Sequence, residues 1–190
     1  MNLIRLFVAT LLLPIFAHGT ERVLKIDREK SFVDVAVEAT AGSFTAHLDQ
    51  YKADIAVDAA GKIRSAIFSF GFSDLKTGKT ERDDKMIKWL GGGQPLGRFE
   101  LGALALTPDG QGQASGRLVF NNSVQRVEFP VVVTQNDDGV YQITGETLID
   151  YREWKLKVIR FALAIKVNPE IRISFKLTGS PVAVSSAAAK

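Results

Sequence analysis

Apolar and polar residues alternate with a period of two along almost the whole chain, and this pattern restricts the fold more than any other feature. Val33, Val35 and Val37 share one face of an expected strand, and the stretch 171–177 repeats the alternation near the other end of the chain. A period of two is typical of a β-strand that buries one face and exposes the other. Because no regular strand–helix alternation accompanies it, we expect an all-β fold with antiparallel strands.

Tight-turn signals separate the strands. Asp or Asn stands with Gly at 58–61, 107–110 and 136–139, which is typical of hairpin loops. Roughly eight strands at a spacing of about ten residues predict an eight-stranded antiparallel β-barrel or a sandwich. The apolar alternation slips by one residue near 49–50 and near 102–103, which indicates two β-bulges. Since bulges curve a sheet, they favour the barrel.

The stretch 77–90 interrupts this alternation and is predicted to form a short helix after the fourth strand. Thr80 or Asp83 could cap its N-terminus, and the glycine run 91–93 would end it. We expect the helix to cover one mouth of the barrel with its apolar face inward. The residues of that face, at helical spacing, are Met86, Trp89 and Leu90.

The stretch 150–167 carries two periodicities that overlap. Trp154, Val158 and Phe161 fit the spacing of a helix, whereas Phe161, Leu163 and Ile165 fit that of a strand. Periodicity leaves both structures open here.

The N-terminus has the pattern of an export signal over residues 1–19, with Arg5 before an apolar run at 6–16. The alternative, a membrane anchor, is disfavoured because this run is too short to cross about 30 Å of hydrocarbon. A barrel domain is expected over 20–180, followed by a disordered tail at 181–190. No later apolar run is long enough to span a membrane.

Composition excludes several classes of site. The chain has no cysteine, which removes disulfides, thiolate nucleophiles and zinc–thiolate centres. The net charge is +3 with cations and acids interspersed, so a nucleic-acid partner is not expected. After removal of the signal, His47 is the one remaining histidine, and we interpret it as a surface or packing residue. No cofactor or metal site is predicted.

Aromatic residues supply the main candidates for a ligand site. Phe68, Phe70 and Phe72 share one face of a strand and form an apolar wall. Such a wall either packs as ordinary core or lines a cavity for an apolar ligand, and an eight-stranded barrel is wide enough to hold one. The residues predicted to bind a ligand are Phe68, Phe70, Phe72, Arg82, Lys85, Met86, Trp89, Phe99, Phe120, Phe129, Tyr141, Arg152 and Phe175.

Short motifs are spread over most of the chain. They are Ile26-Asp27 with Ser31, Thr77-Gly78 with Arg82-Asp83 and Met86, Pro95 with Phe99, and Arg152 with Trp154. In these motifs the chain resembles the YceI-like family. The resemblance implies a lipocalin-like barrel, a location in the bacterial periplasm and binding of a polyisoprenoid.

These observations favour a non-catalytic, exported protein that binds a long-chain amphiphile, with polyisoprenoid implied by the resemblance. Arg82, Lys85 and Arg152 would meet a polar or anionic head group, or would form ion pairs with Asp83, Asp84 or Glu153. Two alternatives stay open: a filled barrel that acts through its surface as an envelope accessory or stress protein, and an enzyme of cyclase or isomerase type using Asp74 or Asp83. A homodimer is also possible.

Overall fold

The computed structural model describes residues 22–161 and 165–183, so the expected signal at 1–19 and the last part of the expected tail lie outside the described residues. In chain order the elements are β1 (Arg22–Ile26), β2 (Phe32–Ala39), β3 (Gly42–Leu48), β4 (Tyr51–Val57), β5 (Ile63–Gly71), η1 (Phe72–Asp74), β6 (Leu75–Lys76), α1 (Thr80–Trp89), β7 (Leu96–Leu106), β8 (Gln111–Phe120), β9 (Ser123–Gln135), β10 (Tyr141–Asp150), η2 (Tyr151–Trp154), β11 (Arg160–Phe161) and β12 (Ile165–Ala183).

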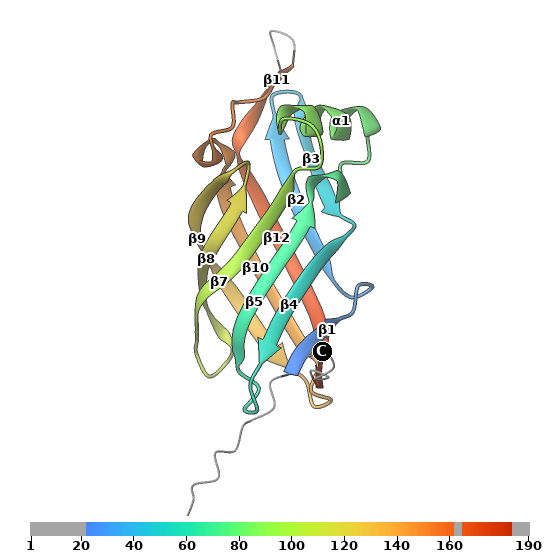
Figure 1. Cartoon of the computed structure of the whole chain (residues 1–190). Coiled ribbons are helices and arrows are strands. Elements are labelled where there is room, and N and C mark those ends of the chain that lie inside the picture. Colours follow the sequence, from blue (N-terminus) through green and yellow to red (C-terminus); the bar gives the residue numbers. More distant parts are fainter. Residues whose placement is uncertain (1–21, 162–164, 184–190) are drawn as a thin grey trace, which may run out of the picture.

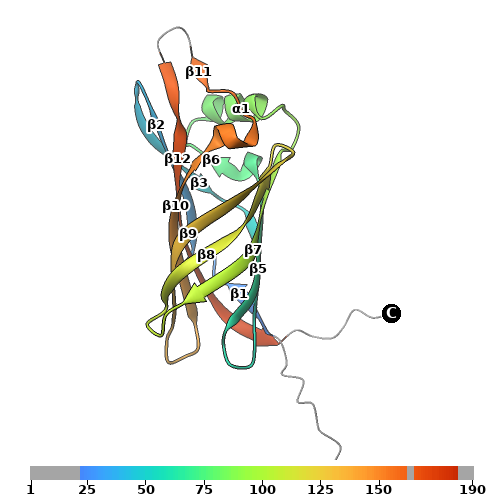
Figure 2. The same cartoon turned by 90° about the vertical axis from the view of Figure 1, so that its left-hand side faces the viewer.

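The strands close into a barrel. Strands β4, β5, β7, β8, β9, β10 and β12 follow one another as neighbours, and β1 completes the ring by pairing with both β12 and β4. At the other end of the barrel, β2 takes the place of β1 beside β12, and β3 continues toward β4 (Figures 1 and 2). Counting β1 with β2 and β3 with β4 as single positions gives an eight-stranded antiparallel barrel, as predicted.

The two expected bulges have different outcomes. The register between β7 and β8 shifts between Leu101 and Ala103, which confirms the second bulge. The first prediction is wrong, because residues 49–50 separate two strands with different partners: β3 pairs with β2 and β6, whereas β4 pairs with β1 and β5. The slip in alternation therefore marks a corner of the barrel and not an extra residue within one strand.

The helix forms as predicted but follows β6, not a fourth strand. The corner at 49–50 divides one expected strand into two, and the short β6, which pairs with β3, was not predicted. Helix α1 begins after Lys79, which makes no side-chain cap, so the prediction of a cap at Thr80 or Asp83 is also wrong. At the other end the N–H of Gly92 donates to the carbonyl of Ile87 and all three glycines have positive φ, which confirms that the run ends the helix.

The stretch 150–167 is neither one helix nor one strand. Asp150 caps the short helix η2 by accepting a hydrogen bond from the backbone N–H of Arg152, and Lys155 ends it in the left-handed conformation at φ 63°. An extended connection then leads to β11, which pairs with the start of β12. At the far end of β12, residues 181–183 pair with β1, so the strand runs into the expected tail.

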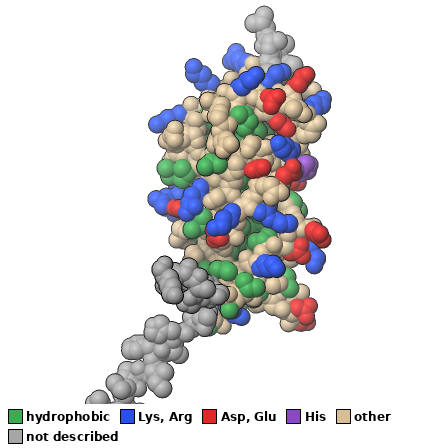
Figure 3. All heavy atoms as spheres, turned by 45° about the vertical axis from the view of Figure 1, so that its right-hand side comes forward, with side chains coloured by type: hydrophobic (Ala, Val, Ile, Leu, Met, Phe, Trp, Pro, Cys, Tyr) green, Lys and Arg blue, Asp and Glu red, His purple; other side chains and the backbone are tan. Residues whose placement is uncertain are grey.

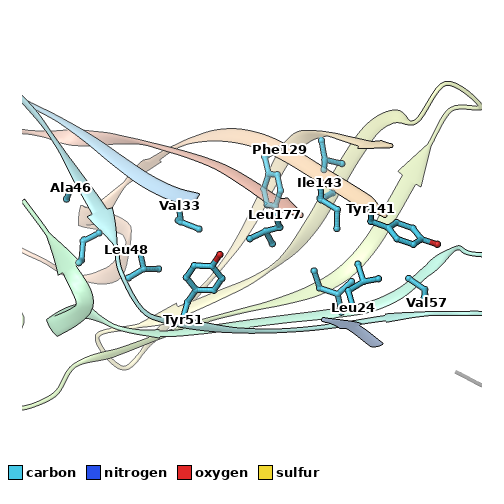
Figure 4. Close-up of a cluster of buried hydrophobic side chains, with 14 residues drawn as sticks. Leu24, Val33, Ala46, Leu48, Tyr51, Val57, Phe129, Tyr141, Ile143 and Leu177 are labelled. Carbon is cyan, nitrogen blue, oxygen red and sulfur yellow. The ribbon is translucent and has the colours of Figure 1, made fainter. Parts of the chain in front are cut away.

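The two ends of the barrel differ in how they are closed. The end that carries the β4–β5, β7–β8 and β9–β10 turns, here called the closed end, is filled by Leu24, Val57 and Tyr141, whose hydroxyl donates to the carbonyl of Gly61 at 2.8 Å. Figure 4 shows these three side chains together at one end of the interior, with Leu48 toward the other. The opposite end, the mouth end, carries α1, η2 and β11 (Figures 1 and 2). Figure 3 shows charged side chains spread over the outer wall, with hydrophobic side chains in small separate groups.

Candidate binding cavity

The barrel encloses a cavity of about 870 Å³. Its wall consists of the inward-facing side chains of the strands, which are almost all aliphatic or aromatic. Many of these residues, including Phe68, Phe99 and Phe175, are only partly buried although they point into the barrel. They keep accessible surface because the space in front of them is empty, which is not the arrangement of a packed core.

Glycines on neighbouring strands help to keep this space open. A Cβ at Gly97 would lie 2.2 Å from the ring of Phe70, and one at Gly145 would lie 2.6 Å from the ring of Phe175. Each glycine also stands directly opposite its phenylalanine in the β-sheet register. The rings of Phe70 and Phe175 therefore pack directly against backbone that carries no side chain. A side chain at either glycine would push the ring further into the cavity.

Aromatic rings form a continuous row along one part of the wall. Phe68, Phe70 and Phe72 follow one another with centroids 6.0 and 5.1 Å apart, and Phe120 continues the row at 5.6 Å. Phe120 in turn stacks at 4.5 Å on Trp154, which is fully buried. The row leads from the middle of the barrel into a second hydrophobic cluster beneath η2, so the wall is anchored at the mouth end.

Polar groups line the cavity at its mouth end and not in its depth. They come from α1 and the loop before it, from β3, from β10, from η2 and from β11. No aspartate or glutamate is among the described lining residues, so the charges that reach the cavity are positive. The polar lining residues are Ser43, Thr77, Arg82, Lys85, Lys88, Thr147, Tyr151 and Arg160.

Helix α1 covers the mouth and is tied down on both sides. Trp89 donates a hydrogen bond from Nε1 to the carbonyl of Lys157 at 2.8 Å, and its ring meets that of Tyr151 edge-on at 5.0 Å. The guanidinium of Arg82 lies 3.8 Å from the centre of the Phe44 ring on β3. These contacts join α1 to two segments that are distant in sequence, with Met86 and Trp89 on the cavity side, as predicted. Leu90, the third residue predicted for that face, lies at the C-cap and is buried in the second hydrophobic cluster without lining the cavity.

The start of α1 is held by a contact within its own loop. Asp83 accepts hydrogen bonds from the backbone N–H of Thr77 at 3.0 Å and from its hydroxyl at 2.6 Å. A carboxylate in the first turn of a helix is also favoured by the helix dipole. Asp83 therefore positions the helix over the mouth, and it does not line the cavity.

Most of the predicted ligand-binding residues come together around the cavity. Tyr141 and Arg152 do not line it. Tyr141 belongs to the floor of the barrel, and Arg152 forms an ion pair with Asp150 at the outer edge of η2, which is not the neighbouring Glu153 that we expected. The predicted residues that do line the cavity are Phe68, Phe70, Phe72, Arg82, Lys85, Met86, Trp89, Phe99, Phe120, Phe129 and Phe175.

Sequence reasoning missed several residues at the mouth. Phe44, Lys88, Tyr151 and Arg160 line the cavity. Spacing could have indicated two of them, because Lys88 lies three residues after Lys85 on α1 and Phe44 alternates with Ala46 and Leu48. Arg160 lies in the stretch whose structure periodicity left open. Burial raises the pKa of Tyr151, whose hydroxyl accepts from the N–H of Ile159 at 3.4 Å, so this phenol stays protonated at the edge of the cavity.

The features expected of an enzyme site are not gathered at this cavity. Asp74 and Asp83, the two proposed catalytic acids, are not among its lining residues. His47 lies on the outer surface, with Nδ1 2.7 Å from Asp34. In the part of the chain that the structure describes, no group of three or more histidines and carboxylates is placed to hold a metal ion. Nor does any helix in residues 22–161 and 165–183 have the length and apolar character needed to cross a bilayer.

Comparison with solved structures identifies the same barrel elsewhere. BcnA of Burkholderia cenocepacia is 18% identical, with a TM-score of 0.67 over 81% of this chain and 99% of that one. A polyisoprenoid-binding domain from Saccharophagus degradans, implicated in plant cell wall breakdown, is 13% identical with a TM-score of 0.64, covering 86% and 99%. The YCEI protein of Campylobacter jejuni is 13% identical with a TM-score of 0.51, covering 74% and 85%. At these identities the likeness concerns the fold.

Comparison of sequences gives the family. No curated protein matches the chain. The family model of the YceI-like domain, however, matches residues 24–179, which include the helix over the mouth and all or most of every strand that closes the barrel. The chain therefore belongs to the family of YceI-like domain proteins.

Proposed function

We propose that this protein is an exported, non-catalytic carrier that holds one long-chain amphiphile inside its barrel. The observation that carries the proposal is the cavity of about 870 Å³, apolar in its depth and polar only at its mouth. This division matches a ligand with a long hydrocarbon tail and one polar end. A polyisoprenoid is the ligand we favour, because a domain with the same fold is described as binding one.

The energetics favour a long tail over specific polar contacts. Each buried CH₂ group contributes about 0.8 kcal/mol, so the affinity should rise with tail length until the cavity is full. The tail must also offset the cost of association, which is about 4–15 kcal/mol. The free energy gained by burying a short apolar molecule would not offset that cost, whereas the gain from a chain that fills the barrel would exceed it.

We place the polar end of the ligand at the mouth. Arg82, Lys85, Lys88 and Arg160 reach the cavity there, and no described carboxylate does. A head group in the closed end would instead lie among Leu24, Val57 and Tyr141, which are buried and almost entirely apolar. Burial of an unpaired polar group among such residues is unfavourable.

The alternatives raised by the sequence are less well supported. A filled barrel does not fit the open interior, and the acids suggested for an enzyme do not face the cavity. Removal of residues 1–19 during export to the periplasm remains part of the proposal. It rests on the sequence of that segment, which lies outside the described residues.

A chain-length series with a cavity-filling variant tests the proposal. Ala53 on β4 lines the cavity, and Ala105 on β7 is exposed on the outer wall, so Ala53→Phe and Ala105→Phe add the same group inside and outside. For prenyl alcohols of increasing length, the affinity of the unmodified protein and of Ala105→Phe should rise by at least about tenfold per isoprene unit until the cavity is full.

The two variants should then differ in binding and not in folding. Ala53→Phe should lose the longest ligands while it unfolds at the same denaturant concentration or a higher one, because the ring enters empty space. In a packed core the same change would cost about 1–3 kcal/mol. Loss of stability without loss of binding, or no binding of any length by the unmodified protein, would refute the carrier proposal.

A further inference from the structure

Acidic residues predominate in the turns of the closed end. These turns hold Asp58, Asp109, Asp137 and Asp138 with one cation, Lys62, and two further cations, Lys25 and Arg64, lie on the adjoining strands. At the mouth end, four cations lie between η2 and β11, on β11 and at the start of β12. These four residues, here called the cationic segment, are Lys155, Lys157, Arg160 and Lys166.

The cationic segment is exposed and lacks internal counter-charges. All four side chains are exposed, and none makes an ion pair with any residue in the described ranges 22–161 and 165–183. Arg160 and Lys166 also stand directly opposite each other where β11 pairs with β12. Like charges in opposite positions of a sheet destabilise it, so this arrangement is unfavourable until an anionic partner lies against it.

The mouth end also carries acidic residues. On η2, Glu153 is exposed, and Asp150 at its start is paired with Arg152. On α1 the acidic residues are Glu81, Asp83 and Asp84, all in the first half of the helix, whereas Lys88 in its last turn lies toward the cavity. Figure 3 shows the same division at the upper end of the molecule, where Lys and Arg side chains surround the end and acidic side chains occupy one side.

We propose that the mouth end docks on a membrane surface rich in anionic phospholipid, and that the cationic segment makes the contact. A bilayer fits better than an acidic protein, because the cations are exposed and lie at the end of the barrel where the polar residues of an otherwise apolar cavity are found. Juxtaposed cations attract an anionic leaflet within about one Debye length. In this orientation the mouth of the cavity faces the bilayer.

Vesicle flotation with charge-reversal variants tests this proposal. The Lys155→Glu/Lys157→Glu/Lys166→Glu variant changes three exposed cations that do not line the cavity. The control, Lys25→Glu/Lys62→Glu/Arg64→Glu, makes the same change in net charge at exposed positions near the closed end. Unfolding curves and prenyl-alcohol binding of both variants verify that the barrel and its cavity are intact.

The unmodified protein should float with vesicles that contain about 30% phosphatidylglycerol and not with neutral phosphatidylcholine vesicles. Binding should disappear as salt rises from about 0.1 M to about 1 M. Each cation near the membrane surface contributes about a factor of five to binding, so the mouth variant should bind on the order of a hundredfold more weakly. The control changes cations away from the contact, so its binding should stay within about threefold of the unmodified protein. Equal losses in both variants, equal binding to neutral vesicles, or binding only to a soluble polyanion such as polyglutamate would overturn the proposal.

A single fluorescent label tests the orientation. Because the chain contains no cysteine, one introduced cysteine carries one label. An environment-sensitive dye on Glu153→Cys at the mouth should change its emission on addition of anionic vesicles, and the same dye on Asp137→Cys at the closed end should not. The reverse pattern would show that the other end docks.

Discussion

Replacement of Trp89 by alanine is expected to lower both the stability of the protein and its retention of a bound lipid. Trp89 is the residue that joins α1 to the far side of the mouth, through its hydrogen bond to Lys157 and its ring contact with Tyr151. It also lines the cavity. The substitution therefore removes a tie between the helix and the barrel together with part of the wall around the ligand.

The contacts of Trp89 set the size of the effect. The hydrogen bond contributes about 0.5–1.5 kcal/mol, and the edge-to-face contact of the rings contributes a similar amount. With the loss of apolar burial, the free energy of unfolding should fall by about 2–3 kcal/mol. Trp89→Phe keeps a ring but not the hydrogen bond, so it should lose only about 1 kcal/mol.

Two measurements separate the roles of the helix. Urea unfolding of the lipid-free protein gives the change in stability, and the dissociation rate of a fluorescent prenyl lipid gives retention. If α1 closes the mouth, dissociation from Trp89→Ala should be at least about tenfold faster, which corresponds to about 1.4 kcal/mol. A loss of stability with unchanged dissociation would refute this reasoning, because α1 would then be a structural plug with no part in holding the ligand.

Three further predictions concern the parts of the structure that support the cavity. Asp83→Ala removes the acceptor of both hydrogen bonds from Thr77 and should lower the free energy of unfolding by about 1–2 kcal/mol in urea titrations; a change under about 0.5 kcal/mol would show that these bonds do not hold the helix. Gly97→Ala should push the ring of Phe70 into the cavity and weaken binding of the longest prenyl alcohols, with unchanged affinity as the contradicting result. The hydrogen bond from Arg152 lowers the pKa of Asp150, so its stabilising contribution should be complete above about pH 4 and be lost as the pH falls through the lowered pKa. Melting temperatures of the unmodified protein and Asp150→Asn should therefore converge at low pH, and a constant difference down to about pH 2 would contradict this assignment.

Much of the barrel could be predicted from the sequence because its strands bury one face and expose the other. Period-two alternation then reports directly which residues face inward, and the phenylalanines of β5 were placed correctly on that basis. The bulge between Leu101 and Ala103 was visible for the same reason. A slip in the alternation does not, however, distinguish a bulge from a corner. At 49–50 that difference depends on which strands pair on either side, which is long-range information.

The candidate site was harder to predict because it depends on empty space. An aromatic stripe has the same sequence pattern whether its rings meet in a core or surround a cavity. The position of Gly97 and Gly145 opposite Phe70 and Phe175 helps to keep the interior open, and this pairing can be read only from the strand register. Arg152 was assigned to the site from its place in a motif, but its nearest carboxylate, Asp150, holds it at the outer edge of η2.

The most direct test of the carrier proposal is native mass spectrometry of the protein purified from its own cells without detergent. The proposal predicts a complex of one chain with one lipid, whose released ligand has a single polar end and a long hydrocarbon tail. The Ala53→Phe variant, prepared in the same way, should carry less of it than Ala105→Phe. A protein that is free of lipid, and that fails to take up prenyl lipids added afterwards, would contradict the proposal that this barrel is a carrier.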